Sequence, residues 1–234
     1  MSGGRHGRGV DLPVVDVYLE RGSKRTFAGV LAWPGWARSG SGDEAALESL
    51  AASAQRYLAV ARRTGLPVDF DAEEPDFVVV QQVRGTATTD FGAIDVVLDT
   101  DVLPVAADEA ERLAVCVEAA WAELDDAADA ASPELRKGPR GGGRDRDPML
   151  EHVLGAEASY ARKIGVAHRQ PALGDREAID AIRSDIASVL RRPWGGEPLG
   201  IGRGKSWPPR YAARRIAWHV LDHAWEMRDK TLGD

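Results

Sequence analysis

The spacing of apolar residues changes near Pro104, and this change most constrains the fold. Before it, Val15, Val17 and Leu19 alternate with polar residues, a period typical of a half-buried strand. After it, apolar residues recur every three or four positions in four successive segments, a period typical of amphipathic helices. We therefore predict an α+β protein, in which a small α+β unit precedes an antiparallel four-helix bundle.

The predicted boundaries follow from turn and cap residues. Residues 1–12 are expected to form a disordered lead, 13–104 the α+β domain and 105–234 the bundle. In the first domain we expect a strand from Leu12, a turn at Gly22-Ser23, a strand over Thr26–Leu31, a helix capped by Asp43 and ended by Gly65, a strand over 77–83, and an irregular strand within 86–101. The bundle helices are expected at 107–131, 148–165, from Asp175 to before Pro193, and 209–228.

Composition excludes several classes of protein. The net charge of −7 argues against bulk attraction to nucleic acid or to an anionic membrane. The single cysteine, Cys116, rules out a disulfide framework and a cysteine zinc cluster. No apolar run approaches the roughly 18 residues of a spanning helix, and the polar N-terminus has no apolar signal segment. We expect a cytoplasmic protein with no membrane partner.

Two histidines of the last predicted helix are spaced for metal binding. His219 and His223 are four residues apart, so their imidazoles project from one face of the helix about one turn apart. A catalytic metal ion normally takes three protein ligands and keeps an open position. His152 is one candidate for the third ligand. Glu157 is the other, because it falls inside the apolar stripe of its helix and could bind the metal or accept an imidazole N–H.

These residues carry a resemblance to a known family. The sequences His152-Val-Leu-Gly-Ala-Glu157 and His219-Val-Leu-Asp-His223 resemble the two motifs of the DinB-like (YfiT-type) four-helix bundle proteins, over residues 107–230. The resemblance implies that His152, His219 and His223 bind a divalent metal, zinc or nickel. It also implies a thiol-dependent transferase or isomerase that uses a low-molecular-weight thiol such as mycothiol or bacillithiol. Asp222 and Glu226 are the candidate catalytic groups for proton transfer.

The N-terminal unit resembles a second family. The segment Phe27-Ala-Gly-Val-Leu-Ala-Trp-Pro-Gly-Trp36 and the helix start Asp43-Glu-Ala-Ala-Leu47 are similar to the HicB-type antitoxin fold, over residues 14–63. In this chain we expect the HicB-like unit to pack on the bundle, to shape the entrance of its site or to support a homodimer.

A basic glycine-rich loop precedes the helix of His152. Lys137, Arg140 and Arg144 lie next to the N-terminus of that helix, where cations and backbone N–H groups attract a carboxylate or phosphate. We predict that these three residues bind an anionic small-molecule substrate or cofactor; a solvated linker is the alternative. The first functional hypothesis is thus a metal-dependent transferase or hydrolase. The second is a non-enzymatic, antitoxin-like interaction module with a structural bundle, and a nucleic-acid role comes third.

Overall fold

The computed structural model describes residues 14–138, 142–199 and 206–232. Within these ranges the chain has a four-stranded sheet and seven α-helices, so the predicted α+β class is confirmed. The expected disordered lead at 1–12 lies outside the described residues. No described helix is both long enough and apolar enough to cross a membrane.

The sheet comprises β1 (Val15–Arg21), β2 (Thr26–Val30), β3 (Ala37–Gly40) and β4 (Phe77–Arg84). Their order is β3-β2-β1-β4, with β1 antiparallel to β2, β2 antiparallel to β3, and β1 parallel to β4. The hairpin and the later strand were predicted, but β3 was not. Its residues, Ala-Arg-Ser-Gly, carry no apolar alternation, and β3 forms because the preceding turn returns the chain to β2.

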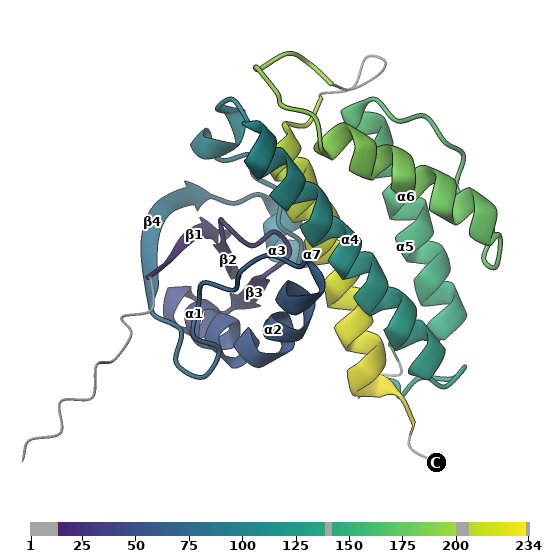
Figure 1. The fold of residues 1–234 in the computed structure, drawn as a ribbon. Helices are drawn as coiled ribbons and strands as arrows, with labels where there is room; N and C mark the ends of the chain where they lie inside the picture. Colours follow the sequence, from purple (N-terminus) through teal and green to yellow (C-terminus); the bar gives the residue numbers. More distant parts are fainter. Residues whose placement is uncertain (1–13, 139–141, 200–205, 233–234) are drawn as a thin grey trace, which may run out of the picture.

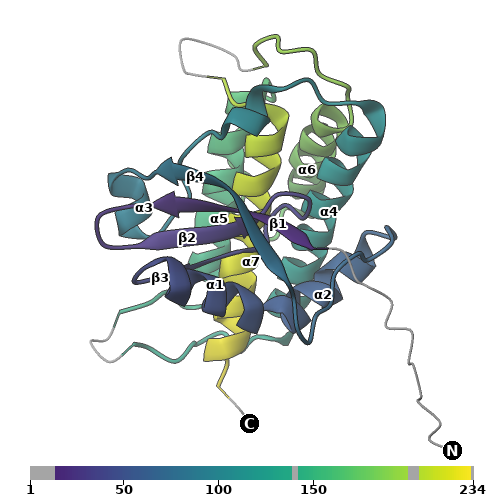
Figure 2. The same ribbon diagram turned by 90° about the vertical axis from the view of Figure 1, so that its left-hand side faces the viewer.

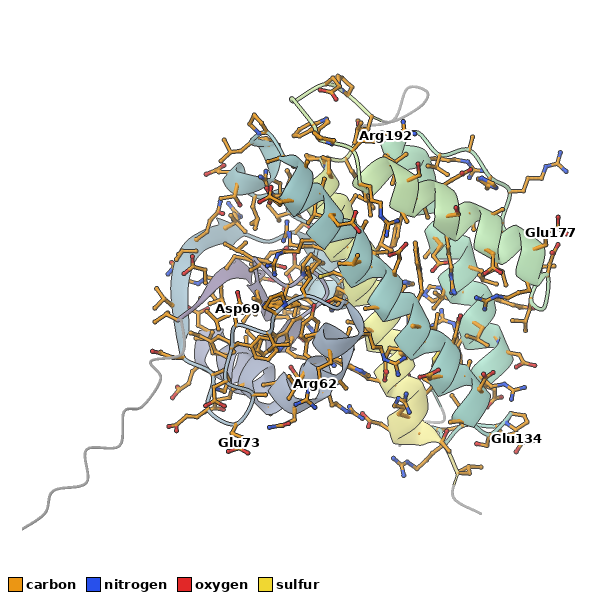
Figure 3. The ribbon with its side chains drawn as sticks, in the orientation of Figure 1. Arg62, Asp69, Glu73, Glu134, Glu177 and Arg192 are labelled. Atoms are coloured by element: carbon orange, nitrogen blue, oxygen red, sulfur yellow. The ribbon has the colours of Figure 1, made fainter. Side chains whose placement is uncertain are left out.

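The helix predicted after Asp43 is two helices, α1 (Asp43–Ala52) and α2 (Ala54–Arg63). The prediction that Asp43 caps the first helix is wrong. Gly42 is the residue before the helix, and the Asp43 carboxylate instead accepts a hydrogen bond of 3.0 Å from Arg21 Nε on β1. These helices pack on the sheet through aromatic residues. The Trp36 and Tyr57 rings stack at 5.1 Å, and the Trp33 indole donates a hydrogen bond of 2.7 Å to Asp69, the residue labelled in Figure 3.

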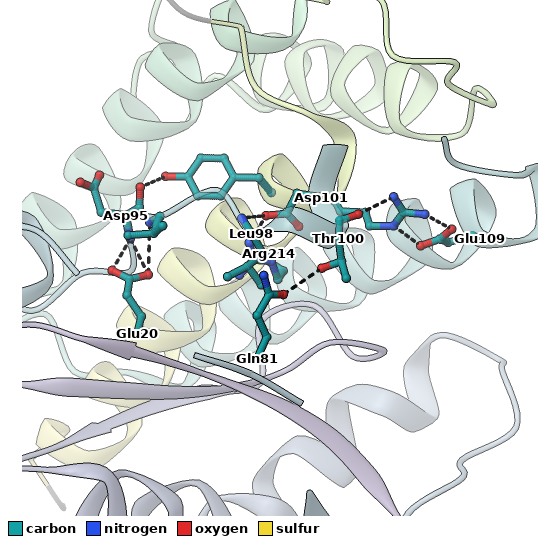
Figure 4. A network of polar contacts seen from close by, with 11 residues as sticks. Glu20, Gln81, Asp95, Leu98, Thr100, Asp101, Glu109 and Arg214 are labelled. Atoms are coloured by element: carbon teal, nitrogen blue, oxygen red, sulfur yellow. Dashed lines mark hydrogen bonds and ion pairs between the residues drawn. The ribbon is translucent and has the colours of Figure 1, made fainter. Parts of the chain in front are cut away.

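The irregular strand predicted within 86–101 is absent. This segment contains the short helix α3 (Ala87–Phe91) and a 3-10 helix at Asp99–Val102. The Thr86 side chain caps α3, which favours a helix over an extended chain. The segment is held on the sheet because Glu20 of β1 accepts a hydrogen bond from Thr89 Oγ1. Glu20 also accepts one from the Asp95 backbone N–H, as Figure 4 shows.

We predict an acid-sensitive contribution to stability from Asp90, the residue that ties α3 to the β1–β2 turn. Hydrogen bonds from the Ser23 hydroxyl (2.5 Å) and the Lys24 backbone N–H (2.7 Å) lower the pKa of Asp90 to about 2, from an ordinary value of 3.8. Its stabilisation is therefore present above pH 3.8 and is lost as the pH falls through the native-state pKa. Asp90→Asn should destabilise the protein at pH 6 more than at pH 2, as measured by urea unfolding. Glu134→Gln, on the surface, is the control; an equal pH effect there would contradict the prediction.

The bundle is formed by α4 (Ala107–Ala130), α5 (Arg146–Ala161), α6 (Arg176–Leu190) and α7 (Pro209–Lys230) (Figure 1). A 3-10 helix at Arg162–Ile164 extends α5. The four helices lie close to their predicted positions. The prediction of an antiparallel bundle is wrong for α4 and α7. Arg210 and Arg228, at opposite ends of α7, pair with Glu109 and Glu123, near the two ends of α4, so α4 and α7 run in the same direction.

The sheet and the bundle meet along α7. Figure 1 shows α4 and α7 next to the sheet, with α5 and α6 on the far side, and Figure 2 shows α7 passing behind the strands. The Phe27 and Trp218 rings meet edge to face at 5.6 Å, and Arg38 of β3 stacks on Trp225 at 4.2 Å. One cluster of buried apolar residues extends from β1 to α7. The domain boundary predicted near residue 104 stays a prediction that the two parts of the chain fold as separate units.

Candidate metal centre

The structure brings His152, His219 and His223 together between α5 and α7. His152 lies near the beginning of α5, and the other two lie one turn apart on α7. One nitrogen from each ring can be chosen so that all three lie within 4.8 Å of one another. The Nε2 atoms of His152 and His219 are 3.2 Å apart. We call these three residues the histidine cluster.

This geometry fits a shared metal ion. Two imidazole nitrogens, each about 2.0–2.1 Å from an ion at a tetrahedral angle, lie about 3.3 Å apart. The observed 3.2 Å between His152 and His219 matches that separation. The Nδ1 atom of His219 is buried without a hydrogen-bond partner in the described part of the chain, so its Nε2 is the atom that faces the cluster. The cluster can therefore hold a metal ion.

The electrostatics of the cluster favour neutral imidazoles, which are the form that binds metals. Burial, followed by the nearby charges of His223 and His152, lowers the pKa of His219 well below its ordinary value. Burial and the charge of Arg144 also lower the pKa of His152. Two of the three rings thus present a lone pair at neutral pH without having to lose a proton.

Glu226 orients the third ring. Its Oε2 lies 3.2 Å from His223 Nδ1, and its Oε1 accepts a hydrogen bond of 2.6 Å from Lys230. The hydrogen bond with His223 is the main cause that lowers the pKa of Glu226 to about 2, so the carboxylate is ionised at neutral pH. An ionised carboxylate on Nδ1 holds the proton there and leaves Nε2 free to bind a metal.

Asp222, the other predicted catalytic carboxylate, faces a different neighbour. It is paired with Arg38 of β3 at 3.2 Å, on the side of α7 that meets the sheet. Burial raises the pKa of Asp222, and the charge of Arg38 opposes that rise. Its contact therefore ties the α+β unit to the helix that carries the cluster.

Glu157, the alternative third ligand, lies away from the cluster. It is buried between α4, α5 and α6, where it accepts a hydrogen bond of 2.5 Å from the Trp121 indole and lies 3.7 Å from Arg183. Burial raises its pKa. Glu157 lies on the face of α5 that packs against α4 and α6, whereas His152 projects toward α7.

Of the three predicted anion-binding cations, Lys137 and Arg144 lie in the described residues, and Arg140 lies outside them. Lys137 is paired with Asp145 at 2.5 Å, which neutralises its charge. The positive charge of Arg144 contributes to the lowered pKa values of two cluster residues, His152 and His219. An anion-binding role for these cations stays a prediction.

Two residues at the site were not predicted. The Tyr160 ring of α5 meets the His219 ring edge to face at 5.7 Å. Arg215 lies one turn before His219 on α7 and is buried. The signal that could have found Arg215 is its position four residues before His219, on the same face of the helix.

Comparisons of this chain with models of protein families, with characterised proteins and with solved structures found no match.

Proposed function

We propose that this chain is a DinB-like metalloprotein in which the histidine cluster binds one divalent metal ion and supports transferase or hydrolase chemistry. The observation that carries the proposal is the convergence of three imidazoles from two helices, each with a nitrogen within 4.8 Å of the others and with the Nε2 atoms of His152 and His219 3.2 Å apart. Imidazole ligands suit zinc and nickel, and three of them leave a position for a further ligand.

Each residue of the site has a distinct task in this proposal. The metal, when bound, lowers the pKa of a coordinated water or of a low-molecular-weight thiol until its anion is present at neutral pH. His152, His219 and His223 hold the ion, and Glu226 fixes the tautomer of His223 through Nδ1. Lys230 holds the second oxygen of Glu226. Glu226 is thus a positioning residue rather than the proton-transfer group that its sequence position suggested.

The HicB-like unit supplies one wall of the entrance in this proposal. A hollow of about 400 Å³ lies on the sheet side of α7, beside Glu226. Arg38 and Arg56 line it from the α+β unit, and Trp225 and Lys230 line it from α7. The three histidines do not line this hollow, but Glu226 borders both the hollow and His223, so a molecule in the hollow would contact the carboxylate that orients His223.

Metal analysis tests the proposal directly. The protein, purified without a histidine tag or chelator and dialysed against zinc, should contain about one equivalent of metal by elemental mass spectrometry. His219→Ala should lose it, because two imidazoles rarely retain an ion through dialysis. His168→Ala is the matched control, since His168 is bonded to Asp185 at 2.8 Å, outside the cluster. Equal metal content in wild type and His219→Ala would refute the site.

The interaction-module hypothesis is the second candidate, and one observation favours it. The edge strand β4 has no neighbour on its outer side within the described sheet, and its Val78 and Val80 are 45% and 50% exposed. The unpaired backbone N–H and C=O groups of an edge strand are a template for pairing with another chain, and exposed apolar side chains beside them favour such an association. A protein that takes up no metal but associates with itself in solution would favour this candidate over the enzyme.

A further inference from the structure

Arg215 is a buried cation with no ion-pair partner among the described residues. Its side chain is on α7, the residue is 9% exposed, and its Nε and Nη1 atoms are buried with no hydrogen-bond partner in the described part of the chain. No ion pair joins it to an acidic residue in those ranges, and its two close contacts are aromatic. The guanidinium lies 5.6 Å from the centre of the Tyr160 ring and 5.4 Å from that of Trp218.

The other strongly buried arginines of the bundle differ from Arg215. Arg214, next to it in sequence, is 3% exposed and forms an ion pair with Asp101. Arg183 is 7% exposed and pairs with Asp125 at 2.9 Å. An isolated buried charge carries a desolvation cost that an ion pair partly offsets. Carboxylates of the chain therefore neutralise two buried arginines, whereas Arg215 has no carboxylate partner in the described part of the chain.

The position of Arg215 relates it to the histidine cluster. Residues four apart on a helix lie on the same face, so Arg215 and His219 are neighbours along α7. Tyr160 touches both, since its ring also meets His219 at 5.7 Å. The charge of Arg215 is one of the causes that lower the pKa of His219, after burial and the other two histidines.

We propose that Arg215 binds the carboxylate group of a small organic substrate beside the histidine cluster. A guanidinium presents a planar fork of N–H donors that matches a carboxylate, and the flat rings of Tyr160 and Trp218 border a planar group. A bound carboxylate would supply the negative charge that the described chain does not provide. The inference rests on the proposed function only in taking the carboxylate to belong to the substrate of the metal site.

Acetate is the probe for this inference, and the readout is thermal stability. The protein is stripped of metal with a chelator and dialysed, so that acetate cannot bind a metal ion. Its Tm is then measured in increasing sodium acetate, with sodium chloride holding the ionic strength constant. A ligand that binds the native state raises Tm by mass action.

Acetate should raise the Tm of the wild type in a saturable manner, and Arg215→Met should show no such rise. Arg215→Lys, which keeps the charge but loses the fork, should bind acetate about tenfold more weakly.

The outcomes separate this inference from the proposed metal site. A wild type that does not respond, or an Arg215→Met variant that responds equally, would overturn the carboxylate role whatever the metal content. An equal response to inorganic phosphate at matched ionic strength would overturn the carboxylate assignment. Failure of zinc to bind would contradict the proposed function, whereas the metal-free acetate experiment would still test whether Arg215 binds a carboxylate. If Arg215→Met does not fold, Arg215→Gln provides the same comparison.

Discussion

Replacing Arg214 with methionine is expected to lower the free energy of unfolding by about 3–5 kcal/mol. Arg214 is 3% exposed, and its Nη2 is hydrogen-bonded to Asp101 Oδ2, which is also buried (Figure 4). In the variant, the Asp101 carboxylate would keep one hydrogen bond, from the Leu98 backbone N–H at 2.7 Å, and would lose its counter-charge. A buried carboxylate without a cation carries the desolvation cost that makes breaking such a pair strongly destabilising.

Arg215→Met is the matched control for this prediction, since it makes the same substitution at the adjacent, equally helical and similarly buried position. It should leave the free energy of unfolding unchanged or raise it, because no described carboxylate loses a partner. Chemical denaturation at pH 7 measures both, with the slope m checked for a constant denatured state. The double variant Arg214→Met with Asp101→Leu should recover much of the loss. A smaller loss for Arg214→Met than for Arg215→Met would contradict the assignment.

The bundle could be predicted from the sequence because its helices carry clear local signals. Leu113, Val117, Trp121 and Leu124 recur at helical spacing on one stripe, and all four are buried. Asp175 accepts a hydrogen bond from the Ala178 backbone N–H, as an N-cap residue should. The relative direction of the helices was not predictable in this way. It is set by contacts between distant residues, such as Arg210 with Glu109, which no local pattern records.

The errors in the α+β unit have the same origin. The β3 residues have weak strand propensity and form a strand because β2 is beside them. The segment before Pro104 has the apolar content of a strand. Its conformation is fixed instead by buried Glu20, which accepts a hydrogen bond from the backbone N–H of Asp95, 75 residues later in the chain. Tertiary contacts therefore determine the secondary structure of these two segments, and they override the preference of the local sequence.

The histidine cluster was partly accessible from the sequence. His219 and His223 are spaced one helical turn apart, so one pair of candidate metal ligands could be derived from the sequence. The choice between His152 and Glu157 depends on which face of α5 meets α7, and the structure places His152 there. That Arg215 has no carboxylate partner among the described residues could not be predicted from the sequence, because it depends on the residues that pack around α7 in space.

Zinc should stabilise the wild-type protein by about 4 kcal/mol when free zinc is about 1,000 times its Kd, because an ion that binds only the native state shifts the folding equilibrium by mass action. His219→Ala should show almost none of this stabilisation. His168→Ala, whose imidazole is bonded to Asp185, should respond like the wild type. Denaturation at fixed free zinc, and again with excess chelator, measures the difference. A zinc effect of equal size in His219→Ala would indicate binding elsewhere on the surface.

The stabilisation by zinc also measures how much Glu226 contributes to metal binding. Glu226 accepts a hydrogen bond from His223 Nδ1, and a neutral glutamine would hold that tautomer and the ring orientation less firmly. Loss of such a carboxylate typically weakens metal binding about 10–100-fold. Because each factor of ten in affinity is worth about 1.4 kcal/mol, Glu226→Gln should lose about 1.4–2.8 kcal/mol of the zinc stabilisation. Its stability in excess chelator should change far less than its zinc response. A variant that loses stability equally with and without zinc would show that Glu226 supports the fold and not the ligand.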